Sequence, residues 1–365
     1  MSKSKLNELA QIGQSIWLDN ISRSMIESGK LKEEISRGLR GMTSNPSIFD
    51  NSISSSADYD GAIKKLAGQG KSTFEIYDDL TVRDVQDAAD MFRPVYEKTG
   101  RVDGYVSLEI NPDLAMKTLE TIEEGRRLFK KVNRPNVMFK VPSTDAGFEA
   151  ITDLLGDGIN VNATLIFSLD QYIKTARAYI EGMKRLHARG GDMSKVHSVA
   201  SVFVSRLDTA VDKMMDARAG EEGLGSFRGK AAVANSRLIF RKFHDIFSGD
   251  EFRALKNKGA NQQRVLWGST GTKNPSYSDI KYVTELIGSP TVNTLPDKTL
   301  AAFMDHGVIK ESLTRDAGDA DNLIESLKGS GIDVNKVCLK LLDDGVAAFQ
   351  KSFESLLNSI ETKKR

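Results

Sequence analysis

Short apolar runs that alternate every two residues recur along the chain, and longer segments with a helical period separate them. Eight of these runs predict β-strands, at 13–20, 39–45, 103–110, 136–142, 158–167, 196–207, 264–270 and 291–296. In the segment 169–188, apolar residues such as Tyr172, Ala176 and Ile180 follow a spacing of about four, which predicts an amphipathic helix. Alternating strands and helices are typical of a parallel α/β fold, and eight such units predict a closed (β/α)8 TIM barrel. An open, doubly wound sheet is the second interpretation.

The chain is longer than a minimal barrel of about 250 residues, and the surplus predicts additional helices on a single domain that spans 1–365. We expect these helices near 53–98, near 217–245 and in a C-terminal extension, 318–361. The last predicted helix places Val346, Phe349, Phe353, Leu356 and Leu357 on one face. The glycines of 223–229 do not have the spacing of a dinucleotide-binding motif, so we expect a flexible loop there.

Composition and charge narrow the classes of function. The 51 basic and 50 acidic residues give a net charge of +1, so no overall field favours nucleic acid or a membrane. The single cysteine, Cys338, lies in an apolar helical run and predicts a buried structural thiol in a reducing compartment. We find no signal-peptide pattern and no run of about 18 apolar residues, and therefore expect a cytoplasmic protein. The four histidines form no zinc-binding motif, so we expect no metal.

A lysine lies in the middle of the fourth predicted strand. In the segment 136–142, Met138 and Lys140 point to one face, and Val137, Phe139 and Val141 to the other. An ammonium group in a β-core is costly unless it is paired or deprotonated, and a neutral amine can form a Schiff base with a carbonyl substrate. For a lone buried lysine, a structural ion pair with a carboxylate is the more common explanation.

Polar residues on one face of most other strands favour the chemical interpretation. They are Asp19 on the face of Trp17; Thr43 and Asn45; Ser107 and Glu109; Asn160, Asn162 and Thr164; Ser201 on the face of Phe203; and Ser269 on the face of Trp267. A structural ion pair requires only one pair of strands, whereas polar groups on most strands indicate a pocket for a polyhydroxylated substrate.

An amine beside two carboxylates provides the groups that Schiff-base carbon–carbon chemistry requires. The amine of Lys140 attacks a ketone, a carboxylic acid protonates the departing water, and a carboxylate takes a hydroxyl proton during cleavage. Asp19 and Glu109 are the two candidate carboxylates, and the hydroxyl of Thr164 can position a relay water. Cations and hydroxyls for a phosphate group follow the sixth and seventh strands, at Ser201, Arg206, Ser269 and Lys273.

Six segments, in their order along the chain, resemble the transaldolase family, and the additional helices together with the segment GSTGTKNP (268–275) resemble its long-chain bacterial subgroup. The six segments are WLDN, SNPSIF, SLEI, MFKVPSTDAGFEAI, INVNATLIFSLDQY and SVFVSRLD, and the resemblance covers about residue 10 to at least residue 310. It implies a TIM barrel without a metal or organic cofactor and a transferase of the pentose phosphate pathway. Such an enzyme moves a dihydroxyacetone unit from sedoheptulose 7-phosphate or fructose 6-phosphate to glyceraldehyde 3-phosphate or erythrose 4-phosphate.

The resemblance also implies a role for each candidate residue. Lys140 aligns with the Schiff-base lysine and Asp19 with the acid–base aspartate, while Glu109 and Thr164 align with the pair that holds the relay water. The residues that align with substrate-binding positions are Asn45 and Asn162 for hydroxyls, Ser201, Arg206 and Ser269 for phosphate, and Phe203 as an aromatic wall. Lys273 is the cation nearest to a family arginine that has no arginine counterpart in this chain, and a lysine binds phosphate as a point charge.

Two alternative functions stay open. A fructose 6-phosphate aldolase would release free dihydroxyacetone, but the resemblance indicates that such aldolases carry an amide where this chain has Glu109. A non-catalytic sugar-phosphate-binding barrel would keep Arg206 and the serines but lose the amine or its acid–base partners, all of which are present. The sequence carries no signal for an oligomeric state.

Overall fold

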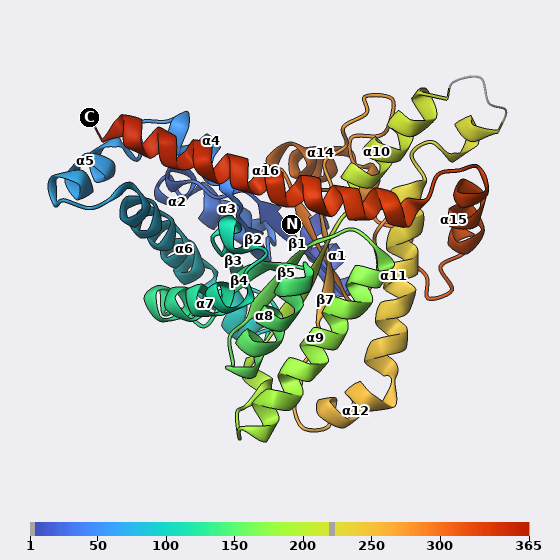
Figure 1. Ribbon diagram of the computed structural model, residues 1–365, viewed down its shortest axis with the longest axis horizontal. Helices are drawn as coiled ribbons and strands as arrows, with labels where there is room; N and C mark the ends of the chain where they lie inside the picture. Colours follow the sequence, from blue (N-terminus) through green and yellow to red (C-terminus); the bar gives the residue numbers. More distant parts are fainter. Residues whose placement is uncertain (1–3, 219–222, 365) are drawn as a thin grey trace.

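The computed structural model describes residues 4–218 and 223–364. Its centre is a closed barrel of eight parallel strands, in which each strand pairs with the next and β8 pairs with β1 (Figure 1). The strands are β1 (Gln14–Asp19), β2 (Gly41–Thr43), β3 (Tyr105–Glu109), β4 (Val137–Pro142), β5 (Val161–Ile166), β6 (Ser198–Phe203), β7 (Arg264–Gly268) and β8 (Thr291–Leu295). The predicted barrel and its eight strands are confirmed, and the alternative of an open sheet is wrong.

Helices cover the barrel, and most of them lie between successive strands in the chain. They are α1 (Lys5–Ile12), α2 (Arg23–Glu27), α3 (Lys30–Arg37), α4 (Pro46–Ser54), α5 (Asp60–Gly68), α6 (Thr73–Lys98), η1 (Pro112–Leu114), α7 (Thr118–Val132), α8 (Asp145–Gly156), α9 (Leu169–Ala188), η2 (Met193–Lys195), α10 (Ser205–Asp216), η3 (Leu224–Phe227), α11 (Ala231–Ser248), α12 (Asp250–Lys256), α13 (Lys281–Thr284), α14 (Asp297–His306), α15 (Ala320–Gly329) and α16 (Val334–Lys363). None of the helices in the described ranges is long and apolar enough to cross a membrane.

The three segments expected to carry additional helices are helical in the structure. The first contains the end of α4 together with α5 and α6, the second contains α11, and the third contains α15 and α16. The predicted flexible loop at 223–229 contains the short 3-10 helix η3, and residues 219–222 of the same glycine-rich stretch lie outside the described residues.

Inward-facing side chains fill the barrel in two layers. The lower layer, toward the amino ends of the strands, is apolar and contains Trp17, Met138, Val199, Leu266 and Val292, which form one buried cluster with Tyr96 and Tyr105. The upper layer lies two residues further along the same strands and is polar at Asp19, Lys140, Ser201 and Thr294. The polar layer therefore occupies the carboxyl ends of the strands, where barrels of this kind hold their active sites.

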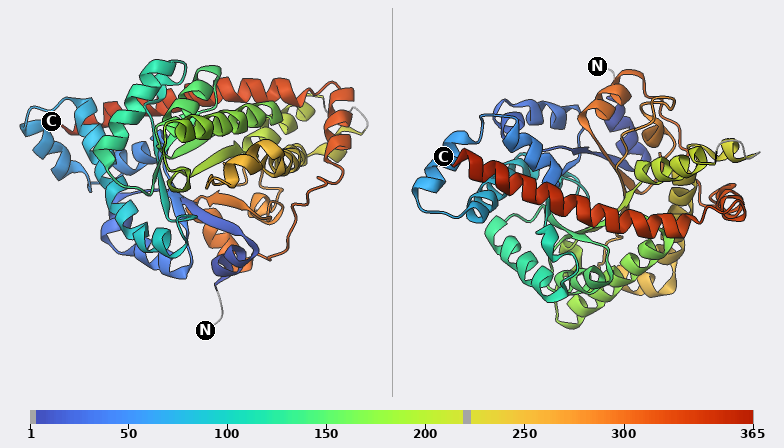
Figure 2. Two further views of the ribbon diagram at one scale, coloured as in Figure 1. Left: turned by 90° about the horizontal axis from the view of Figure 1, so that it is seen from below. Right: turned by 45° about the horizontal axis from the view of Figure 1, so that its top comes forward.

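The last helix, α16, crosses the barrel rather than joining the ring of helices around it (Figures 1 and 2). It packs on α4, α6 and α10, and its buried stripe includes Gly345, Phe349, Phe353, Leu356 and Ile360. A Cβ atom at Gly345 would lie only 3.1 Å from Leu165 Cδ2, so glycine lets the helix approach the end of β5 closely. The apolar face that the sequence predicts for this helix is thus turned toward the carboxyl end of the barrel.

Cys338, at the start of α16, is the buried structural thiol that the sequence predicts. Its side chain is fully buried, and its Sγ lies 3.4 Å from the carbonyl oxygen of Phe167. Burial raises the pKa of the Cys338 thiol to about 12, so the thiolate required of a nucleophile is strongly disfavoured.

Candidate active site

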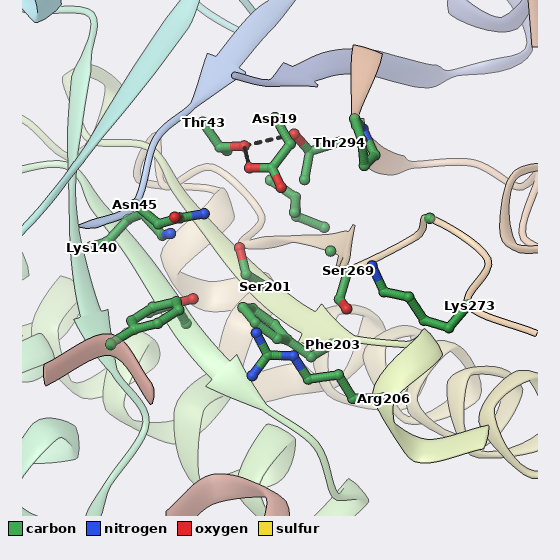
Figure 3. A pocket seen from close by; sticks show the side chains of 16 residues that line it. Asp19, Thr43, Asn45, Lys140, Ser201, Phe203, Arg206, Ser269, Lys273 and Thr294 are labelled. Carbon is green, nitrogen blue, oxygen red and sulfur yellow. Dashed lines mark hydrogen bonds between the residues drawn. The ribbon is translucent and has the colours of Figure 1, made fainter. Parts of the chain in front are cut away.

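A cavity lies at the carboxyl ends of the strands, beside α16 (Figure 3). It is lined by Asp19, Thr43, Asn45, Lys140, Thr164, Ser201, Phe203, Arg206, Leu266, Gly268, Ser269, Gly271, Lys273, Thr294, Pro296 and Phe349. Every candidate site residue from the sequence is in this set except Glu109 and Asn162, which do not line the cavity. Residues far apart in the chain therefore converge on one site, as the polar faces of the predicted strands require.

Lys140 has a carboxylate partner and also faces the cavity. Glu109 and Lys140 are register neighbours on β3 and β4, and adjacent strands lie about 4.8 Å apart. The amine Nζ lies 2.8 Å from Glu109 Oε2 and donates a hydrogen bond to the carbonyl oxygen of Ser44 at 3.0 Å. The ion pair with Glu109 fits a structural role for Lys140. The position of the amine at the edge of the cavity fits a role as a nucleophile as well.

Burial sets the proton affinity of Glu109. Desolvation raises the pKa of its carboxyl group, and the neighbouring charge of Lys140 opposes that rise. A carboxylate with a raised pKa is a better proton acceptor, and Glu109 is the carboxylate that lies 2.8 Å from the Lys140 amine.

Asp19 is held by a chain of two hydroxyls from neighbouring strands. Thr43 donates to Asp19 Oδ1 at 2.6 Å, and the hydroxyls of Thr43 and Thr294 are 2.7 Å apart (Figure 3). Because Thr43 gives its single proton to the carboxylate, Thr294 must donate to Thr43. Burial raises the pKa of Asp19, while the hydrogen bond from Thr43 and the charges of Lys140 and Arg206 oppose the rise. The result is a half-buried carboxylate with an increased affinity for a proton.

Asn162 does not reach the cavity but fixes a serine that does. Its Nδ2 donates to Ser107 Oγ at 3.0 Å, and its Oδ1 accepts the proton of Ser201 at 2.6 Å. With that proton engaged, Ser201 presents lone pairs to the cavity and suits a substrate hydroxyl, whereas a phosphate oxygen needs a donor. Asn45 caps α4 by accepting from the backbone N–H of Ile48 at 3.0 Å, which leaves its Nδ2 as a donor toward the cavity.

One side of the cavity is cationic. Figure 3 shows Arg206, Ser269 and Lys273 there, and neither cation forms an ion pair with a carboxylate in the described part of the chain. The Arg206 guanidinium lies 5.3 Å from the centre of the Phe203 ring, and Ser269 Oγ is 3.1 Å from Ser205 Oγ. Two cations without carboxylate partners, beside hydroxyl donors, make an anion-binding region.

The face predicted for Ser269 is wrong, and its backbone conformation explains the error. On β7 it is Leu266 and Gly268 that line the cavity, while Trp267 is fully buried in the core outside the barrel. Ser269 nevertheless faces the cavity because its φ of +52° lies in the left-handed region and interrupts the two-residue alternation. This conformation costs about 1–2 kcal/mol in a non-glycine residue and is often found at functional sites.

Seven lining residues are not among the sequence candidates for the site, namely Thr43, Leu266, Gly268, Gly271, Thr294, Pro296 and Phe349. Thr43 was recognised only as a polar position, and Thr294 lies two residues after Val292, a spacing that does signal the inward face of β8. Phe349 gave no such signal, because the helical period shows that it lies on an apolar face but not what that face contacts.

Comparison with known proteins shows similarity along nearly the whole chain. A family described as Transaldolase/Fructose-6-phosphate aldolase matches residues 16–360. A transaldolase from Trichodesmium erythraeum is 43% identical over 373 aligned positions, which cover 100% of this chain and 98% of that protein. Transaldolase 2 from a Nostoc species is also 43% identical, with 100% and 98% covered. A transaldolase from Mycobacterium ulcerans is 44% identical, with 99% and 97% covered.

Proposed function

The chain belongs to the transaldolase/fructose-6-phosphate aldolase family, and we propose that it transfers a three-carbon dihydroxyacetone unit through an imine on Lys140. The observation that carries this assignment of residues is the position of Lys140. Its amine is paired with Glu109 at 2.8 Å and faces a cavity that has Asp19 on one wall. Another wall has two cations that pair with no carboxylate among the described residues.

The function predicted from the sequence, a transaldolase acting on sugar phosphates, is confirmed by the full-length relatives. Within that class we propose sedoheptulose 7-phosphate or fructose 6-phosphate as the donor. We propose glyceraldehyde 3-phosphate or erythrose 4-phosphate as the acceptor. These molecules combine several hydroxyls with one phosphate, and the cavity combines several polar side chains with one cationic side.

Imine formation uses the pair of Lys140 and Glu109. Glu109 accepts a proton from Nζ, and the free amine adds to the C2 carbonyl of the donor. Glu109 then protonates the carbinolamine oxygen, which leaves as water. Thr164 lines the same cavity, and its hydroxyl has no hydrogen-bond partner among the described residues. That hydroxyl is therefore available to hold the relay water.

Cleavage of the carbon–carbon bond uses Asp19. Its carboxylate takes the proton of the C4 hydroxyl, the C3–C4 bond breaks, and the electron pair moves into the imine to give an enamine on Lys140. An aldose phosphate leaves, and a second aldose phosphate then accepts the three-carbon unit by the reverse steps. The raised pKa of Asp19 favours proton uptake.

The remaining side chains bind and orient the substrate. Arg206, Lys273 and Ser269 are proposed to bind the phosphate, and Asn45 and Ser201 the hydroxyls. The position of Asn162 supports an indirect role, in which it orients Ser201 through their 2.6 Å hydrogen bond. Phe203 forms the apolar wall against which the Arg206 guanidinium lies.

We also propose a single domain and a cytoplasmic location. The packing of α16 on α4, α6 and α10 supports one unit, because it joins the end of the chain to three parts of the ring. The buried free thiol of Cys338 suits a reducing compartment.

The test is a turnover assay of the full chain with fructose 6-phosphate, with and without erythrose 4-phosphate. A transaldolase forms sedoheptulose 7-phosphate and glyceraldehyde 3-phosphate only when the acceptor is present. Equal release of free dihydroxyacetone without an acceptor would replace this proposal with an aldolase. Binding of fructose 6-phosphate in a calorimeter, without either reaction, would indicate a sugar-phosphate-binding barrel.

A further inference from the structure

Phe349 brings an aromatic ring to Lys140 from the far end of the chain. It is 3% exposed, and its ring centre lies 5.7 Å from Lys140 Nζ and 6.5 Å from the ring centre of Phe203. The groups printed in direct contact with the amine, Glu109 Oε2 at 2.8 Å and the carbonyl oxygen of Ser44 at 3.0 Å, are polar. Phe349 therefore adds an apolar surface beside this amine, next to the apolar wall that Phe203 forms.

The position of this ring is fixed on both sides along α16. One turn earlier, Gly345 packs closely against Leu165. A Cβ atom at position 345 would lie only 3.1 Å from Leu165 Cδ2. One turn later, the Phe353 ring packs edge-on against Tyr77, with ring centres 5.1 Å apart. The helix is thus anchored to the barrel end and to α6, and Phe349 is held between these anchors.

The reaction has an intermediate that water can divert. After cleavage, the enamine on Lys140 either attacks an acceptor aldehyde or takes a proton on its free carbon and becomes an iminium ion. Water adding to C2 of the iminium gives a carbinolamine. Its C–N bond then breaks with the electron pair going to nitrogen, releasing dihydroxyacetone and the free amine. One water is consumed, nothing is oxidised or reduced, and the transferred unit is lost.

We infer that Phe349 is a positioning residue that excludes water from the three-carbon unit on Lys140 and so sets the ratio of transfer to hydrolysis. The inference rests on the proposed function. An apolar ring beside Nζ leaves water without a hydrogen-bond partner on that side of the site.

The chain provides a matched control on the same helix. Phe353 lies four residues after Phe349 on the same face and is equally buried, but its ring contacts Tyr77 and Phe74 instead of the cavity. If Phe349 only helps to dock α16, substitutions at the two positions should change the ratio of hydrolysis to transfer equally. If Phe349 shields the intermediate, only the substitution at Phe349 should change this ratio.

The experiment compares Phe349→Leu, Phe349→Met and Phe353→Leu in the full chain. Leucine and methionine keep an apolar side chain, so folding is retained and is checked by thermal unfolding. With fructose 6-phosphate and erythrose 4-phosphate present, the measured quantity is dihydroxyacetone released per sedoheptulose 7-phosphate formed. We expect this ratio to rise about tenfold in both Phe349 variants and less than about twofold in Phe353→Leu.

An unchanged ratio in the folded Phe349 variants, or an equal rise in Phe353→Leu, would overturn the inference. Borohydride trapping on the wild-type chain separates this failure from that of the proposed function. A Lys140 adduct with an unchanged ratio rejects only the role of Phe349. Absence of the adduct in the wild-type chain rejects the imine mechanism on which the inference rests.

Discussion

The two layers inside the barrel differ by two residues along the same strands. Met138 and Lys140 follow one another on the inward face of β4, as Val199 and Ser201 do on β6. The lower layer excludes water and stabilises the barrel, whereas the upper layer contains buried polar groups that cost stability unless they are paired. A single strand therefore contributes to packing at one end and to chemistry at the other.

Charged residues at the two ends of the barrel show the same difference. At the amino end, Arg264 pairs with Asp103 at 2.9 Å and donates to Ser15 at 2.9 Å, so its charge is compensated within the protein. At the carboxyl end, Arg206 and Lys273 line the cavity without forming an ion pair in the described chain. The first arrangement is complete without a ligand, and the second is suited to an anion from outside.

The largest expected effect separates the two layers on β4. Lys140→Met removes the amine and should lower kcat by at least about 10³-fold, because losing a covalent nucleophile leaves only binding effects. Met138→Ala, two residues earlier, should instead lower the free energy of unfolding by about 2–5 kcal/mol and leave the activity of the folded fraction nearly unchanged. Steady-state kinetics and urea unfolding of both variants provide the measurement. Substantial turnover by Lys140→Met would show that the amine is structural.

The next largest effect is a loss of stability when the ion pair of Arg264 and Asp103 at the amino end of the barrel is broken. Arg264→Met leaves Asp103 buried without its partner, and we expect a loss of about 3–5 kcal/mol in the free energy of unfolding. KM for the sugar phosphate should not change, because the residue lies outside the cavity lining. Denaturant unfolding tests the first expectation and kinetics the second. A large change in KM without loss of stability would contradict the assignment of stability to the amino end of the barrel and of substrate binding to the carboxyl end.

The cation at the carboxyl end should show the opposite pattern. Lys273→Met removes a phosphate-binding charge without leaving a carboxylate unpaired, so stability should be retained. Loss of one charge-assisted contact, worth about 1.5 kcal/mol, should raise KM for fructose 6-phosphate about tenfold with little change in kcat. Lys273→Arg should restore most of the affinity. A fall in kcat at unchanged KM would place Lys273 in the chemical step instead.

The smallest effect is a shift of the pH profile. Thr43→Val removes the hydrogen bond that lowers the pKa of Asp19, so that pKa should rise further. Because the account requires Asp19 as a carboxylate, activity is lost as pH falls through this pKa, and the acid limb of kcat/KM should move up by about one pH unit. Thr43→Ser should keep the wild-type profile. An acid limb that does not move in Thr43→Val would remove Asp19 as the group that controls it.

The barrel and most of its site follow from local patterns in the sequence. Strands with two-residue alternation are recognisable one at a time, and polar residues such as Asp19, Glu109 and Lys140 stand out on apolar faces. Since parallel strands of a closed barrel end at the same rim, the pattern places these side chains together without knowledge of their distances. The direct contact of Lys140 with Glu109 also follows from their neighbouring strands.

Other features depend on information that no local pattern contains. Ser269 reaches the cavity through a left-handed backbone conformation, which a count of alternating residues does not predict. The direction of the hydrogen bond from Ser201 to Asn162 requires the partner strand to be known. Phe349 joins the site only because α16 crosses the barrel, a tertiary arrangement that the helical period leaves open.

Borohydride reduction in the presence of fructose 6-phosphate, followed by peptide mass mapping, tests the central claim most directly. The account predicts a reduced three-carbon adduct on Lys140 in the wild-type chain and none in Lys140→Met. A folded wild-type chain that binds fructose 6-phosphate but carries no adduct on Lys140 would contradict it.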